Sequence, residues 1–77
     1  MSELREWVRE EIERIYTDAL STGYVNEDDV CDELNDYFDD VEVCDDAVLK
    51  QAYGLALHAT DDDGMAKLKA ALDLLAA

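Results

Sequence analysis

The sequence has no proline, three glycines and one histidine. With so few residues that break helices, little interrupts long helical segments. A run of 18 apolar residues is also missing, which excludes a membrane span, and the charged first residues do not resemble a secretory signal. These absences predict a soluble protein of the cytoplasm, without a membrane partner.

Soft metal ligands are scarce as well. Cys31 and Cys44 lie 13 residues apart, with no CxxC pattern. A zinc site would need two further soft ligands, and His58 is the only histidine. We expect two reduced, partly buried thiols, although a disulfide between them remains open.

An Asp-Asp-Asp-Gly sequence ends at Gly64 and invites comparison with an EF-hand calcium loop. With Gly64 at position six, Ala59 and Ala70 would occupy the first and last ligand positions, where the loop needs carboxylates. His58 has no nucleophile in a supporting pattern, and no glycine-rich phosphate loop is present. We therefore expect no metal, no cofactor and no catalytic residue.

The 77 residues predict one acidic helical domain over 1–77. Apolar residues recur at helical spacing over about 3–20, and Gly23 follows as a left-handed stop. Trp7 is predicted to anchor the core from this first helix. Further helices are expected at about 27–39 and 46–59, and a fourth is expected to follow a loop over 60–64 and to run to about residue 75.

The segment between the second and third expected helices, Val41 to Val43, alternates like a strand but has no partner strand, so it is expected to be a connector. The helix at 46–59 is apolar almost all round, which predicts that the other helices sandwich it. Gly54 in its middle would permit a close backbone approach. The predicted fold class is all-α, a small bundle of about four short helices.

Charge is the informative property of this chain. The formal net charge is −15, and residues 26–46 carry eleven acids with no lysine, arginine or histidine. Such a surface repels nucleic acid and anionic lipid and attracts basic proteins. The expected partner is therefore a basic nucleic-acid-binding protein or complex, with no direct contact to nucleic acid.

On one continuous helix at about 100° per residue, this segment separates into two faces. The apolar face is predicted to enter the core; it consists of Val30, Cys31, Leu34, Tyr37, Phe38 and Val41. The opposite face is a stripe of seven carboxylates along roughly 18 Å of axis, a charge density approaching that of duplex DNA. The candidate partner-binding residues are this stripe and three acids beyond it: Asp28, Asp29, Asp32, Glu33, Asp36, Asp39, Asp40, Glu42, Asp45 and Asp46.

In size, charge pattern and acidic segment 26–46, the chain resembles the small acidic inhibitors of phages and mobile elements, notably DNA-mimicking anti-CRISPR and anti-restriction proteins. The resemblance implies a non-enzymatic inhibitor that occupies the DNA-binding groove of a host defence complex. For a phage-encoded protein, the compartment would be the host cytoplasm.

Three other interpretations compete with mimicry. The acids could form a solvated face of a salt-adapted domain, although salt adaptation should spread them over the whole surface. The chain could also be a helical protein-interaction module. Acyl carrier proteins share its length and acidity, but their carrier serine stands in an Asp-Ser-Leu motif, and the serines here, Ser2 and Ser21, lack that context.

Overall fold

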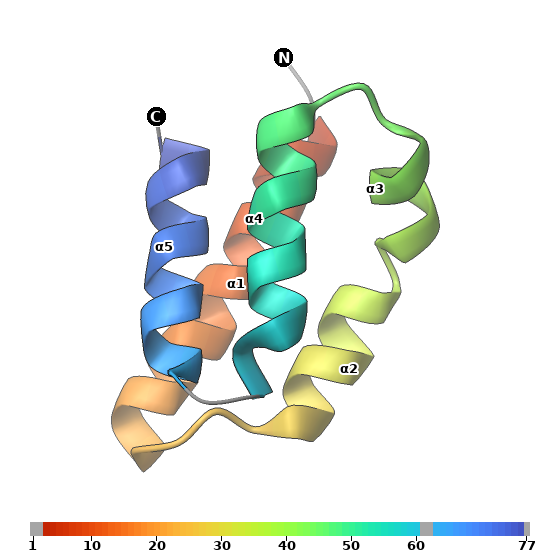
Figure 1. Ribbon diagram of the computed structural model, residues 1–77. Helices are drawn as coiled ribbons and strands as arrows, with labels where there is room; N and C mark the ends of the chain where they lie inside the picture. Colours follow the sequence, from red (N-terminus) through yellow and green to blue (C-terminus); the bar gives the residue numbers. More distant parts are fainter. Residues whose placement is uncertain (1–2, 61–62, 77) are drawn as a thin grey trace.

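The computed structural model of the protein describes residues 3–60 and 63–76 (Figure 1). This part of the chain contains no strand, and the predicted all-α class is confirmed. The helices are α1 (Glu3–Thr22), α2 (Glu27–Asn35), α3 (Phe38–Val43), α4 (Ala47–Leu57), the 3-10 turn η1 (His58–Thr60) and α5 (Gly64–Ala76). The single helix expected over 27–39 is instead divided between α2 and α3.

The helices form a small bundle in which α1, α4 and α5 pack together, and α2 and α3 follow one another along the other side of α4 (Figure 1). α4 contacts each of the other four α-helices. Its apolar composition predicted this central place, but one side of it remains open to solvent, where Val48 is 37% exposed. None of the helices in 3–60 and 63–76 is long and apolar enough to cross a membrane.

Local sequence signals set the helix ends. Gly23 has a φ of 88°, the left-handed conformation that ends α1. The Asn26 side chain accepts a hydrogen bond from the Asp28 N–H at 2.9 Å and caps α2. The Asp46 carboxylate does the same for α4, accepting from the Leu49 N–H at 3.0 Å.

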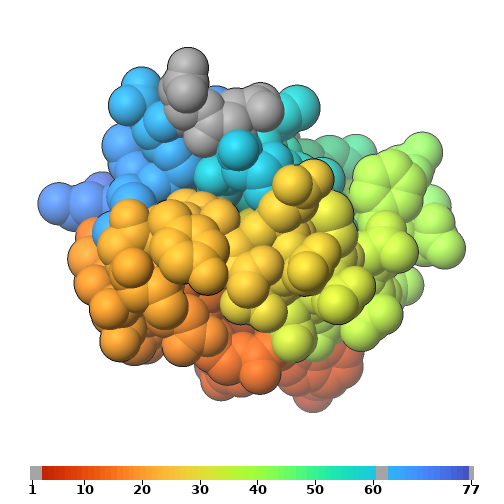
Figure 2. Space-filling view, turned by 90° about the horizontal axis from the view of Figure 1, so that it is seen from below, coloured from red at the N-terminus to blue at the C-terminus, as the bar shows by residue number. Residues whose placement is uncertain are grey.

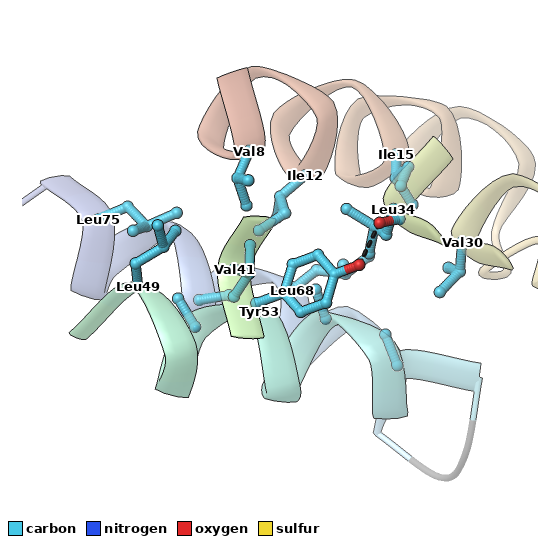
Figure 3. Close-up of a cluster of buried hydrophobic side chains, with 14 residues drawn as sticks. Val8, Ile12, Ile15, Val30, Leu34, Val41, Leu49, Tyr53, Leu68 and Leu75 are labelled. Carbon is cyan, nitrogen blue, oxygen red and sulfur yellow. Dashed lines mark hydrogen bonds between the residues drawn. The ribbon is translucent and has the colours of Figure 1, made fainter. Parts of the chain in front are cut away.

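Side chains from all five α-helices meet in one hydrophobic cluster (Figure 3). Tyr53 of α4 extends across this cluster, and its hydroxyl donates a hydrogen bond to the backbone carbonyl of Leu34 in α2. The most fully buried large side chains are Ile12, Leu34, Leu49, Leu68, Val8 and Val30.

Several apolar residues predicted to be buried are not. Trp7 is 48% exposed, so the prediction that it anchors the core is wrong. Val8 faces the cluster, and the neighbouring Trp7 lies about 100° around the helix, at the edge of the buried face. On the acidic segment, Cys31 is exposed and Phe38 is 45% exposed, which also contradicts the expected core face.

The break between α2 and α3 explains part of this difference. Asp36 keeps helical backbone angles, whereas Tyr37, with a φ of −102° and a ψ of 0°, departs from them, and its N–H bonds to the Leu34 carbonyl at 3.0 Å. The chain then restarts as α3, so Val41 lies in a helix and the expected connector over 41–43 is wrong. Val41, which is 3% exposed, is the buried residue of α3.

Candidate binding surface

The ten candidate acids, called the acidic surface below, follow α2, the α2–α3 turn, α3 and the loop into α4. Nothing along α2 or α3 offsets them, because neither helix contains a lysine or an arginine. α2 carries Asp28, Asp29, Asp32 and Glu33; the turn carries Asp36; α3 carries Asp39, Asp40 and Glu42; and the loop carries Asp45 and Asp46.

The acidic surface is not one straight row. The estimate of a stripe about 18 Å long assumed a continuous helix, and the break at Asp36 and Tyr37 removes that assumption. The break also changes the position of Asp39 and Asp40 relative to a helix end. They do not stand at the end of a long helix, where the helix dipole disfavours anions, but in the first turn of α3. Their position therefore needs no functional explanation.

Glu33 is joined to α1 by an arginine. Arg14 forms ion pairs with Glu33 and, at 2.6 Å, with Glu11. Burial raises the pKa of Glu11, and a hydrogen bond with Glu33 raises it further, while Arg14 acts in the opposite direction. Glu33 is thus part of a contact between α1 and α2 and is only partly available to a partner.

Asp46 also has a structural role. Besides capping α4, its carboxylate lies 3.5 Å from the guanidinium of Arg5 on α1. The Arg5 guanidinium in turn donates to the Leu74 carbonyl on α5 at 3.4 Å. Asp46 therefore holds the starts of α1 and α4 together near the end of α5.

The other eight carboxylates of the acidic surface form no ion pair and accept no side-chain hydrogen bond within the described residues. Asp29 is half-buried, and the remaining seven are exposed. Unpaired acids on one side of a small protein produce a strong local negative field, which attracts cationic groups.

The structure adds residues to this region that the linear segment 26–46 did not indicate. Tyr37 is half-buried, and its pKa is raised first by burial and then by the charges of Glu11, Asp36, Glu33 and Glu10. Glu10 and Glu11 of α1 therefore contribute to the negative field around the α2–α3 turn. The sequence does not indicate this contribution, because Glu10 and Glu11 are adjacent residues on a helix of mixed charge. Their contribution to the field depends on how α1 packs against α2.

The cysteines are both free, Cys31 exposed and Cys44 half-buried. Cys31 therefore departs from the expectation of a partly buried thiol. The Cys44 thiol donates to the Val41 carbonyl at 3.0 Å, within the last turn of α3. Within the described residues, no group of three or more histidine, cysteine, aspartate or glutamate side chains could hold a metal ion.

The carboxylates of this surface can attract cations and accept hydrogen bonds. His58 stands at the C-terminal end of α4 and is exposed. Catalysis by paired carboxylates needs burial or unlike environments that separate their pKa values, and seven of these acids are open to solvent. No protein-family model, curated protein or solved structure matches the chain, so the function of this surface is inferred from its geometry and charge.

Proposed function

We propose that the protein is a non-enzymatic inhibitor that mimics the charge of nucleic acid and blocks the DNA-binding groove of a basic protein or complex, in the manner of anti-CRISPR and anti-restriction proteins. The acidic surface is the binding site. The partner provides lysine and arginine side chains that otherwise hold phosphates, and neither nucleic acid, a membrane nor a cofactor takes part.

One observation carries this proposal: eight carboxylates on consecutive elements have no cationic partner within the described chain. The bases of the protein lie on other helices, namely α1, α4 and α5. Arg14 and Arg5 engage only Glu33 and Asp46 of the acidic surface. A surface whose acids were balanced by its own bases would have little charge left to offer a partner.

The mechanism is competition for a shared site. Opposite charges steer the inhibitor to a basic groove and raise the association rate, especially at low salt. Desolvated pairs between Asp32 or Asp36 and partner lysines would then slow dissociation. Because α2 and α3 are separate short helices, the proposed mimicry concerns charge density and not the straight geometry of a duplex.

A helical interaction module is the second candidate, and a specific observation favours it. Trp7, Phe38 and Val43 are 48%, 45% and 80% exposed, and large apolar side chains on a surface can serve as binding anchors. Such a module would bind through apolar burial, so its affinity should change little with salt, whereas charge mimicry weakens steeply as salt rises.

The experiment is capture from a nuclease-treated bacterial lysate at low salt, followed by elution with duplex DNA. The proposal expects captured proteins that bind nucleic acid and are released by DNA. Asp32→Lys with Asp36→Lys should abolish capture. Glu6→Lys with Asp73→Lys changes the net charge by the same amount on exposed positions of α1 and α5, and should retain it. Capture that survives the first pair, or resists both DNA and salt, would rule out mimicry.

A further inference from the structure

A cavity of about 170 Å³ lies where the end of α1 meets the start of α2, in the region where their surfaces lie side by side in Figure 2. Its apolar lining includes Ile15, Ala19 and Tyr24, and its acidic lining is Asp18 and Asp29. Since one water occupies about 30 Å³ in the liquid, the cavity has room for roughly five or six waters. It is smaller than the about 300–1,000 Å³ typical of sites for drug-sized ligands, and suits the head of one side chain.

The two carboxylates at this cavity have no partner of their own. Neither Asp18 nor Asp29 forms an ion pair or a side-chain hydrogen bond within the described residues. Asp29 is half-buried, so part of its hydration is already lost. Both acids add negative charge at the lining of the cavity, and a cation that entered it would be attracted to that charge.

The chain around the cavity is already ordered. The Thr22 hydroxyl lies 3.0 Å from the Asp18 carbonyl and 3.0 Å from the Tyr24 carbonyl, which fixes the turn through Gly23. The capping bond from Asn26 fixes the other side. A ligand would therefore meet a largely formed site and lose little entropy by ordering it.

We propose that this cavity receives an arginine side chain of the basic partner, an inference that rests on the proposed function and locates an anchor within it. A guanidinium is flat and weakly hydrated, and it stacks on aromatic rings, which suits a cavity bounded by Tyr24 and apolar side chains. A lysine ammonium is more strongly hydrated and suits such a lining less well. A calcium ion requires six to eight oxygen ligands, more than two carboxylates supply.

Asp29 belongs to both the cavity and the acidic surface, and its neighbours along α2 include Asp28 and Asp32. Long-range attraction by the exposed acids would bring the partner close, and one arginine would then enter the cavity and set the orientation. Bidentate contacts from arginine or lysine to guanine are the commonest specific contacts of DNA-binding proteins, so a DNA-binding groove can present such an arginine.

The test needs no partner protein. The isotope-labelled protein is titrated with N-acetyl-arginine methylamide while its backbone amide signals are followed by NMR. The expected result is weak saturable binding, with the shifts concentrated at Ile15, Ala19, Tyr24 and Asp29. The lysine analogue should bind less tightly, and the uncharged citrulline analogue should produce no saturable shift.

Matched variants locate the site. Asp18→Asn with Asp29→Asn should weaken arginine binding at least tenfold, whereas Glu6→Gln with Asp73→Asn, which removes the same charge from exposed positions outside the acidic surface, should leave it within twofold. Tyr24→Ala removes the aromatic wall from a residue that is 60% exposed, so the fold should be retained while binding weakens. Shifts spread evenly over the acidic surface, or equal losses in both double variants, would overturn the proposal.

The anchor and the proposed function can fail separately. If the partner is captured and released by DNA but arginine does not bind the cavity, mimicry stands and the anchor is wrong. If arginine saturates the cavity and no nucleic-acid-binding protein is captured, the arginine site stands, and its assignment to a DNA-binding partner is wrong.

Discussion

The Tyr53 hydroxyl donates a hydrogen bond to the Leu34 carbonyl at the point where α2 ends (Figure 3). In an uninterrupted helix that carbonyl would accept from the N–H of Phe38, four residues on. Here it accepts from Tyr53, which lies 19 residues away along the chain, and from the Tyr37 N–H at 3.0 Å. A side chain of α4 thus replaces the bond that would have continued α2 into α3.

Replacing Tyr53 with phenylalanine should lower the free energy of unfolding by about 1 kcal/mol, because one buried hydrogen bond is lost while the ring still fills its place. The loss of stability stays modest because the Leu34 carbonyl still accepts a hydrogen bond from the Tyr37 N–H. Urea denaturation followed by circular dichroism measures it. Tyr24→Phe, at a side chain that is 60% exposed, is the control and should change little. A change at Tyr53 no larger than that control would contradict a stabilising bond.

The burial of the Tyr53 hydroxyl predicts alkaline sensitivity. Burial, followed by the charges of Asp36 and Asp39, raises the pKa of Tyr53 from 10.0 to about 12. The neutral phenol therefore contributes stability that is complete below pH 10, where the unfolded chain keeps its proton too. This stability is lost as pH rises from 10 through 12, since the unfolded chain ionises first.

Urea midpoints measured between pH 9 and pH 12 test this expectation. The wild-type midpoint should fall more steeply over that range than the midpoint of Tyr53→Phe, which has no phenol at this site. Parallel curves for the two proteins would show that Tyr53 does not titrate with a raised pKa in the folded state.

Features of the fold that depend only on residues close together in the sequence were predictable from the sequence. Gly23 ends α1 through its left-handed backbone. Asn26 and Asp46 cap α2 and α4 by accepting hydrogen bonds from amides two and three residues further along the chain. The hydrogen bond from Tyr53 at the helix break was not predictable, because its donor lies on α4, 19 residues away. The exposure of Trp7 was not either, since helical periodicity gives the direction of a face but not its width.

The candidate surface shows the same division. The sequence shows directly that acids are concentrated in residues 26–46. In the structure, the acids of α2 and α3 lie on consecutive helices. Which acids are already paired depends on tertiary packing. Arg14 reaches Glu33, and Arg5 reaches Asp46, across pairs of helices whose register no local pattern specifies.

Two glycines should respond in opposite directions to alanine. A Cβ at Gly54 meets nothing within 4 Å, so the expected close backbone approach is absent. Gly54→Ala should therefore stabilise the protein by about 0.5–1 kcal/mol through helix propensity. A Cβ at Gly64 would overlap the Ala59 carbonyl oxygen and crowd Val25, so Gly64→Ala should destabilise it by roughly 1–3 kcal/mol. Thermal unfolding distinguishes the two, and equal shifts would contradict the packing described.

Arg14 should stabilise the α1–α2 contact in a pH-dependent way. Arg14→Gln leaves Glu11 and Glu33 beside each other without a cation, and should lower the Tm at pH 7. The pKa of Glu11 is already raised by burial, and losing Arg14 raises it further. An acid with a raised folded pKa opposes folding at neutral pH, and this effect disappears as pH falls and the group takes up a proton.

The Tm difference between Arg14→Gln and wild type should therefore be smaller at pH 4 than at pH 7. Arg9→Gln, which removes an exposed pair with Glu13 within α1, is the control and should cost less at pH 7. A penalty for Arg14→Gln that is equal at both pH values would show that repulsion between Glu11 and Glu33 is not its source.

Salt should stabilise the folded protein, because eight carboxylates on neighbouring elements repel one another without compensating bases. The Debye length falls from about 30 Å at 0.01 M to about 10 Å at 0.1 M, so most of the gain in Tm should come below physiological ionic strength. For a domain of this size, a gain of about 1 kcal/mol corresponds to roughly 4–8 °C.

Asp32→Lys with Asp36→Lys should raise the Tm at low salt and flatten the salt dependence, whereas Glu6→Lys with Asp73→Lys should flatten it less. A salt-adapted domain would behave differently: it would be unfolded at 0.1 M KCl and would fold only near molar salt, which would remove the reason to assign the acids to a partner.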